Sequence, residues 1–139
     1  MAAADVAHKS IYDELGDERK RLQLEGLVPL WVTTPAYQLL KDKYITKKYP
    51  DVYSIYKRIA NAAAKHMDDQ EHWGKVFFNL LWSGWLAPST PVLSNMGADG
   101  GCPVSCSGNY VGDSIREFYR SQEENAILSK NGFGTSSYL

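Results

Sequence analysis

The sequence predicts a mainly α-helical protein whose first, helical part is followed by a part of different composition. Apolar residues recur at helical spacing before residue 86, whereas eight of the eleven glycines lie from Gly84 onward. One segment of the later part, residues 103–111, alternates with the period of a β-strand. We therefore expect a helical domain over residues 1–86 and the start of a second domain over residues 87–139.

The first two helices are indicated by charge and by a capping pattern. The first spans about residues 10–24, and its charged run 17–21 fits either a solvated face or a rim contact with another surface. Thr34 followed by Pro35 predicts the start of a second helix of about three turns. The side chains expected along one side of that helix are Tyr37, Leu40 and Tyr44.

Two longer amphipathic helices follow, at about residues 51–67 and 69–83. Asp51 is the expected N-cap of the first, directly after Pro50. The apolar face of the first helix consists of Val52, Ile55, Tyr56, Ile59, Ala60 and Ala63. The apolar face of the second consists of Trp73, Val76, Phe77, Leu80 and Leu81.

The residues after Trp85 are rich in turn formers, and three prolines between positions 88 and 103 argue against a continuous helix. We expect a structured loop or a pair of extended pieces there, and then the strand at 103–111. A helix from Ser114 to about residue 130 follows and ends at Asn131 and Gly132. Its expected buried face consists of Ile115, Phe118 and Tyr119. Residues 132–139 look like the start of a further element, so we expect the chain to stop in mid-fold.

Composition excludes several classes of protein. Fifteen Lys and Arg against sixteen Asp and Glu give a net charge of −1, which argues against a general nucleic-acid-binding role. No apolar stretch approaches the roughly 20 residues of a membrane span, and no secretory signal precedes the first helix, so we expect a cytoplasmic protein without a membrane contact.

The alternative function is a small helical interaction or nucleic-acid-binding module, with a tryptophan face and a basic patch. That face would consist of Trp73, Trp82 and Trp85, and the patch of Lys41, Lys43, Lys47 and Lys48.

The two cysteines and one aspartate are the residues most suited to chemistry. Cys106 lies within the predicted strand, where it is either a redox thiol or a small buried residue. A disulfide with Cys102 requires the chain to turn back between them, and the histidines lack a metal-binding spacing, so we expect no metal site. Asp113 precedes the last helix, where it either caps the helix or accepts hydrogen bonds from a nucleobase or ribose.

Four ordered blocks of sequence resemble one protein family. They are DERKRLQLEG at 17–26, APSTPVLSNMG at 87–97, PVSCSGNYVGDSIREFY at 103–119 and LSKNGFGTSSYL at 128–139. Together they resemble the amino-terminal portion of the catalytic large (alpha) subunit of class I ribonucleotide reductases. The resemblance implies a helical domain followed by a ten-stranded α/β barrel, of which this chain holds the first strand and helix.

The resemblance also implies roles for individual residues. Cys106 is similar to a redox-active cysteine that supplies electrons while the ribose 2′-hydroxyl is removed. Asp113 resembles a residue of the site that binds a deoxynucleoside triphosphate effector. The residues that resemble contacts or borders of the substrate nucleotide are Thr90, Ser105, Asn131 and Gly132. Cys102 is outside the family pattern and receives no role.

Partners follow from the same resemblance. The chemistry needs at least three thiols, and the chain has two, so we expect it to be inactive alone and to assemble with the remaining carboxy-terminal part of the large subunit. Whether a divided gene, a split intein or truncation explains this stays open. A radical-generating small subunit, a thioredoxin- or glutaredoxin-type reductant and a large-subunit homodimer are the other implied partners. The resemblance implies ATP and deoxynucleoside triphosphates as effectors of the full enzyme, and no cofactor bound directly by this chain.

Overall fold

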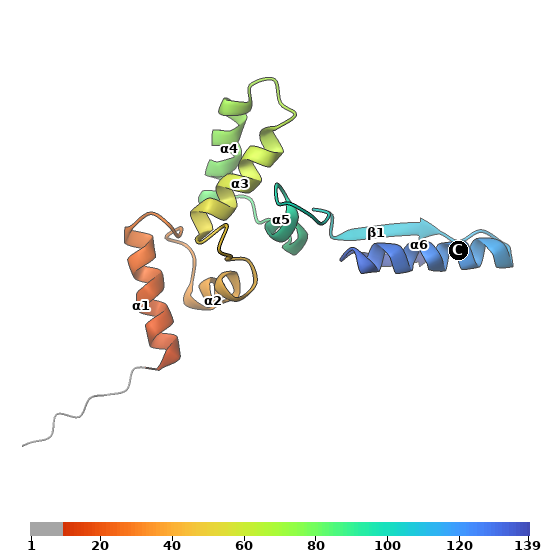
Figure 1. The fold of residues 1–139 in the computed structure, drawn as a ribbon, viewed down its shortest axis with the longest axis horizontal. Coiled ribbons are helices and arrows are strands. Elements are labelled where there is room, and N and C mark those ends of the chain that lie inside the picture. Colours follow the sequence, from red (N-terminus) through yellow and green to blue (C-terminus); the bar gives the residue numbers. More distant parts are fainter. Residues whose placement is uncertain (1–9) are drawn as a thin grey trace, which may run out of the picture.

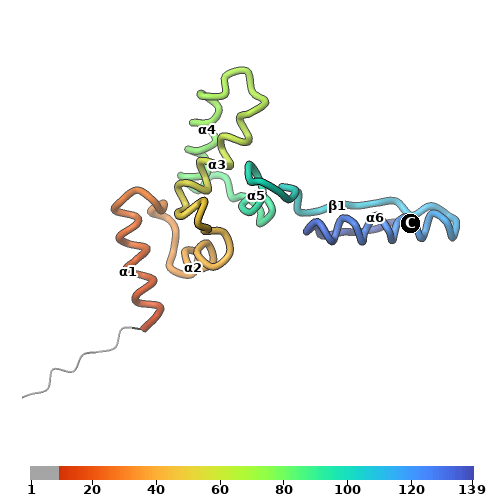
Figure 2. The backbone as a smooth tube through the Cα atoms, in the orientation of Figure 1, coloured from red at the N-terminus to blue at the C-terminus, as the bar shows by residue number. Residues whose placement is uncertain are grey.

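A computed structural model describes residues 10–139 of the chain. Helices α1–α5 lie together, and a unit of two strands and one helix extends from them, with β1 and α6 side by side (Figure 1). The same path can be followed along the backbone in Figure 2. The elements are α1 (Ile11–Leu24), α2 (Thr34–Lys43), α3 (Val52–Ala64), α4 (Gln70–Trp82), α5 (Thr90–Asn95), β1 (Cys106–Tyr110), α6 (Ile115–Lys130) and β2 (Gly134–Tyr138).

Helix α1 begins with a reciprocal cap and contacts α2 through part of its charged run. Ser10 Oγ accepts from the Asp13 backbone N–H at 3.2 Å, and the Asp13 carboxylate accepts from the backbone of Ser10. Glu18 accepts hydrogen bonds from Tyr37 Oη at 3.1 Å and from Lys41 Nζ at 2.5 Å. Arg19 donates to the carbonyl of Val32 at 2.9 Å. Of the two alternatives for the charged run, the rim contact therefore applies to Glu18 and Arg19.

The start of α2 differs from the expectation by one residue. Thr33, with extended backbone, is the N-cap, so that Thr34 is the first helical residue and Pro35 follows within the first turn. Tyr37 and Leu40, predicted on one side of this helix, are buried, and Tyr44 is half-buried at the end of the helix. A proline fits here because N–H groups of the first turn need no partner within the helix.

Helix α3 is the centre of the apolar core. Asp51 is its N-cap, as predicted, and accepts from the backbone N–H of Ser54 at 2.7 Å. Five predicted apolar residues of this helix are less than 5% exposed, whereas Ala63 is half-buried and Ala64 takes its place. The core residues are Val28, Val32, Tyr37, Leu40, Val52, Ile55, Tyr56, Ile59, Ala60 and Leu81.

The inward side of α4 is rotated from the predicted one. Trp73 and Leu80 are each 39% exposed, whereas Gly74 and Leu81 are buried. The reason is the close approach of α3 and α4 at Gly74. A Cβ at this glycine would meet Asn61 Oδ1 at 3.4 Å, so a glycine, which the apolar pattern ignores, lies on the contact line.

The segment expected to be a loop or extended pieces contains the short helix α5, so that prediction is wrong. Pro91 lies in the first turn of α5, where its missing N–H costs no helical hydrogen bond. Helix α5 packs on α3 through Val92, Leu93 and Met96. Arg58 of α3 donates to the carbonyls of Leu93 and, at 3.0 Å, Ser94. The domain division between residues 86 and 87 stays a prediction.

Strands β1 and β2 are parallel, and α6 is the crossover between them; we call residues 106–138 the βαβ unit. Cys106 lies opposite Gly134, and Tyr110 lies opposite Tyr138. The strand β1 lies within the predicted 103–111 segment but is shorter. The final residues, expected only to begin a new element, form the second strand. Because successive side chains of a strand point to opposite faces, Cys106 and Tyr110 lie on the face of β1 away from Asn109.

The predicted buried face of α6 is exposed, which corrects that expectation. The exposed fractions are 80% for Ile115, 49% for Phe118 and 68% for Tyr119. The opposite side of α6 contacts the strands through polar groups. Asn109 donates to the carbonyl of the buried Ser121 at 3.0 Å. An apolar stripe is buried only where something covers it, and here the helix packs on the strands through its polar side.

Candidate functional site

Several of the predicted site residues meet where the two strands begin. The backbone N–H of Gly134 donates to the carbonyl of Ser105 at 2.8 Å, next to the Cys106–Gly134 pair. The turn into β2 consists of Asn131 and Gly132, with Gly132 at φ +89° and its N–H donating to Ser129 at 3.0 Å. Since parallel strands begin at the same edge, Ser105, Cys106 and this turn form one local site.

The thiol of Cys106 is exposed on the strand face that points away from α6. The Ser105 hydroxyl lies 3.7 Å from its Sγ, and the neighbouring positions on that face include Gly108 and Gly134. Cys106 and Cys102 are both free thiols, so the disulfide considered from sequence does not form here. An accessible thiol among small residues can react with a substrate or with a second thiol. Across residues 10–139, no cluster of three or more His, Cys, Asp or Glu side chains could hold a metal ion.

Asp113 lies at the opposite end of β1 from Cys106. Ser114 is the N-cap of α6, because its hydroxyl accepts from the backbone N–H of Glu117 at 3.2 Å, and Asp113 is therefore not the cap. The four strand residues 107–110 lie between Cys106 and this end of β1, which corresponds to roughly 13 Å of extended chain. The exposed Asp113 carboxylate borders a surface hollow formed by Tyr110, Val111, Ile115, Phe118, Tyr119 and Leu139.

Thr90 belongs to α5 and lies outside the strand-edge site in the chain. Its hydroxyl oxygen accepts a hydrogen bond from Tyr44 Oη at 3.0 Å. The connection from α5 to β1 is held by Asn95, which donates to the carbonyl of Cys102 at 2.9 Å. The sequence predicted Tyr44 on one side of this helix but not its contact with Thr90, because that contact depends on how α2 and α5 pack.

The basic patch is partly neutralised by acidic side chains. Lys48 Nζ lies 2.5 Å from Asp99 Oδ2, and Lys41 Nζ lies 2.5 Å from Glu18 Oε2. The hydrogen bond with Asp99 raises the pKa of Lys48, and the one with Lys48 lowers the pKa of Asp99. Two of the four lysines are therefore paired within the chain, which weakens their use as phosphate contacts.

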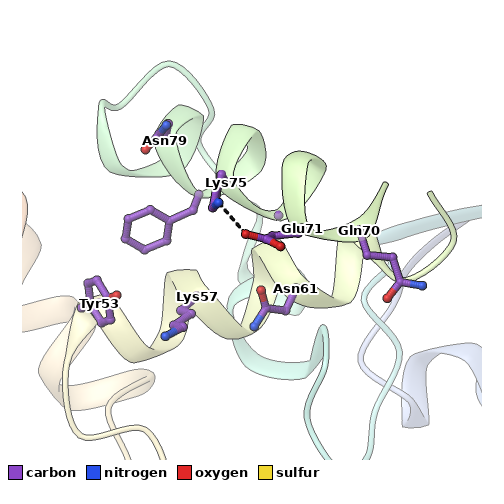
Figure 3. Close-up of a pocket in the computed structure, with 9 residues that line it drawn as sticks. Tyr53, Lys57, Asn61, Gln70, Glu71, Lys75 and Asn79 are labelled. Carbon is purple, nitrogen blue, oxygen red and sulfur yellow. Dashed lines mark hydrogen bonds and ion pairs between the residues drawn. The ribbon is translucent and has the colours of Figure 1, made fainter. Parts of the chain in front are cut away.

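A groove between α3 and α4 is a further surface hollow, which sequence reasoning missed (Figure 3). Its lysines are engaged within the groove: Lys75 Nζ lies 2.6 Å from Glu71 Oε1, and Lys57 Nζ lies 5.6 Å from the ring centre of Tyr53. The other lining residues are Asn61, Gln70, Gly74, Phe78 and Asn79. The groove thus holds one ion pair, Lys75 with Glu71, and a second cation, Lys57, beside an aromatic ring.

The three tryptophans of the alternative function do not share one environment. Trp82 stacks on Phe78, with ring centres 5.4 Å apart, and is half-buried. Trp85 is 85% exposed, and Trp73 is 39% exposed.

Among the described helices, none combines the length and apolar character needed to cross a membrane.

Comparisons with known proteins agree on one family. The family model described as "Ribonucleotide reductase, all-alpha domain" matches residues 31–101. The ribonucleoside-diphosphate reductase subunit alpha of Chlamydia muridarum is 33% identical over 97 residues, which cover 67% of this chain and 9% of that protein. The ribonucleoside-diphosphate reductase large subunit of Invertebrate iridescent virus 3 is 26% identical over 134 residues, which cover 96% of this chain and 18% of that protein.

A solved structure gives the same result. The class Id ribonucleotide reductase alpha subunit of Actinobacillus ureae superposes with a TM-score of 0.67 and 32% identity, over 78% of this chain and 21% of that one. The chain thus spans a small fraction of the length of the relatives it matches. The mainly helical architecture, the family model and these relatives together show that the chain belongs to the ribonucleotide reductase large-subunit family and carries its all-alpha domain.

Proposed function

We propose that this chain supplies the amino-terminal part of a catalytic large subunit that reduces ribonucleoside diphosphates to deoxyribonucleoside diphosphates. Family membership and the printed names of the relatives support this reaction class. The observation that carries the proposal is the exposed Cys106 thiol at the start of β1, beside the turn that leads into β2.

In the proposed reaction, the ribose 2′-hydroxyl is replaced by hydrogen and leaves as water. Two electrons are required, and two thiols supply them as they are oxidised to a disulfide. Cys106 is one of these two thiols. Since the chain has two cysteines and Cys102 receives no role, the second electron-donating thiol and the thiyl-radical cysteine come from the rest of the subunit.

The proposed nucleotide contacts lie around this thiol and on α5. Ser105 and the turn at Asn131 and Gly132 border the nucleotide at the strand edge, and Thr90 contacts it from α5. Asp113, at the other end of β1, belongs to the site for a deoxynucleoside triphosphate effector. The separation of Cys106 from Asp113 along the strand suits two distinct ligand sites, one for reduction and one for control.

The proposed partners are those that complete the reaction. The remaining large-subunit sequence supplies the other strands of a ten-stranded barrel, which begins with β1, α6 and β2. A small subunit generates the radical, a thioredoxin- or glutaredoxin-type protein reduces the disulfide, and two large subunits form a homodimer. The cytoplasm, where cysteines stay reduced, suits this thiol cycle.

The test replaces Cys106 in the complete enzyme, assembled from the large subunit that contains this sequence, the small subunit and a dithiol reductant. Cys106→Ser should abolish multiple turnover, because serine cannot form the disulfide, while deoxynucleoside triphosphate binding is retained. Cys102→Ser is the matched control and should keep turnover. Unchanged turnover in Cys106→Ser would exclude the proposed redox role.

A further inference from the structure

A hydrogen bond joins the end of α2 to the start of α5. Tyr44 Oη donates to Thr90 Oγ1 at 3.0 Å, between residues 46 positions apart in the chain. Tyr44 is half-buried and Thr90 is exposed, so the bond runs from the edge of the helical core to the surface. It connects Thr90, a proposed nucleotide contact, to a residue for which neither the sequence nor the comparisons suggested a role.

The donor side of this bond is firmly held. Tyr44 is the C-terminal cap of α2, and its backbone N–H donates to the carbonyl of Leu40 at 2.9 Å. Its ring packs against the apolar core. The backbone and the ring of Tyr44 are therefore both held in place. The packing of the helical part thus sets the position of the phenol oxygen.

The backbone on the acceptor side is also held. Arg58 donates to the carbonyl of Ser94, which lies in α5 four residues after Thr90. The guanidinium carbon of Arg58 lies 4.5 Å from the ring centre of Tyr49, which fixes the arginine in turn. The exposed Thr90 side chain is thus attached to a fixed helix, and its χ1 rotation is the freedom that remains.

The direction of the bond decides what the threonine can do. A hydroxyl has one hydrogen to donate and two lone pairs to accept with. When Tyr44 donates to one lone pair, the Thr90 hydrogen is directed away from Tyr44 and stays available for another acceptor. A ligand oxygen, such as that of a nucleotide phosphate or ribose, is an acceptor of this kind.

We propose that Tyr44 is a positioning residue that orients the Thr90 hydroxyl to donate a hydrogen bond to an acceptor oxygen of the substrate nucleotide. The inference rests on the proposed function, because it requires Thr90 to contact the nucleotide. Tyr44 itself does not touch the nucleotide. Its contribution is to remove the rotational freedom of Thr90 before the nucleotide binds, which strengthens binding without adding a contact.

The test measures steady-state reduction of a ribonucleoside diphosphate by the complete enzyme with Tyr44→Phe, Thr90→Val and the double variant. Tyr44→Phe keeps the ring and removes the donor, so KM should rise about two- to tenfold, as expected for one neutral hydrogen bond, with kcat nearly unchanged. In the Thr90→Val background, Tyr44→Phe should add nothing, because the group on which it acts is gone.

The matched control is Tyr53→Phe, which removes a phenol hydroxyl from α3 on the groove and should leave KM unchanged. If wild type fails to reduce the nucleotide, the proposed function and this inference both fall. If Thr90→Val raises KM and Tyr44→Phe does not, the inference alone is wrong. It is also overturned if the two substitutions are additive, or if Tyr44→Phe lowers the melting temperature and kcat with KM unchanged, since that pattern is a structural role.

Discussion

The helical part and the βαβ unit use the same kind of amphipathic helix with opposite results. In α3, apolar residues such as Ile55 and Ala60 are fully buried against other helices. In α6, Ile115 is 80% exposed, and the side that meets the strands is polar, with Asn125 Nδ2 donating to Ser137 Oγ at 2.7 Å. An apolar stripe therefore specifies a face, while the partner that covers the face must be supplied separately.

The two regions also differ in what stabilises them. The helical part has a contiguous core with aromatic contacts, such as Tyr53 and Phe78 at 5.1 Å between ring centres. In the βαβ unit, the buried residues between 106 and 138 are Val111 and Ser121. Parallel strands are normally covered on both faces. The barrel that we propose would cover the face that carries Cys106 and the outer side of α6.

One substitution in each region tests this difference. Ile55→Ala should lower the free energy of unfolding by about 2–5 kcal/mol, because it removes a fully buried side chain and leaves a cavity. Ile115→Ala should change it by less than about 0.5 kcal/mol, because the side chain is largely exposed. Urea denaturation of the chain, followed by circular dichroism, measures both. Equal losses would show that α6 is covered within this chain and would remove the contrast.

A pair of glycines gives a smaller contrast of the same kind. Gly97 has φ +73°, and a Cβ there would lie 2.9 Å from Ala62 Cβ and 3.1 Å from the carbonyl oxygen of Arg58. Gly132 has φ +89° and open space around it. Gly97→Ala should therefore destabilise by about 2–4 kcal/mol, from strain and a clash, and Gly132→Ala by about 1–2 kcal/mol from strain alone.

The same denaturation experiment measures the two glycine variants. The Gly132→Ala variant serves as the control for backbone strain, so the difference between the two variants reports the contact of the α5–β1 connection with α3. A Gly97→Ala loss no larger than that of Gly132→Ala would indicate that this connection is loosely attached to the helical part, contrary to the packing described above.

Much of the helical part could be predicted because its signals are local. Caps and apolar spacing located α1 to α4 within a few residues, and Asp51 caps α3 as expected. The short helix α5 was missed because prolines were taken as evidence against a helix, although Pro91 lies in a first turn, where proline is tolerated. The rotated face of α4 was missed because Gly74 carries no apolar side chain and the contact at Gly74 depends on α3.

The candidate site was predictable in its residues but not in its arrangement. The alternating pattern placed Cys106 on a strand, and the helix end placed the turn at Asn131 and Gly132. Cys106 and this turn meet because β2 pairs in parallel with β1, and no local pattern encodes that pairing. The Tyr44–Thr90 hydrogen bond likewise depends on how α2 and α5 pack. Long-range pairing is the information that residue spacing lacks.

The pH dependence of stability tests how tightly the polar rim of the helical part is coupled to its core. Burial, followed by the negative charge of Glu18, raises the pKa of Tyr37 to about 12. In the unfolded chain the phenol loses its proton near pH 10, whereas in the folded chain it keeps the proton until about pH 12. Stability that is fully present below pH 10 should therefore be lost as the pH rises from 10 to 12.

Urea midpoints of wild type, Tyr37→Phe and Glu18→Gln across this range measure the coupling. Tyr37→Phe has no phenol to ionise, so its midpoint should fall less steeply than that of wild type between pH 10 and 12. Glu18→Gln should lie between the two, because it removes the charge while the burial of Tyr37, the larger cause, remains. Parallel curves for wild type and Tyr37→Phe would mean that the α1–α2 contact opens before the core does, and the rim would then resemble the loosely packed βαβ unit more than the helices it borders.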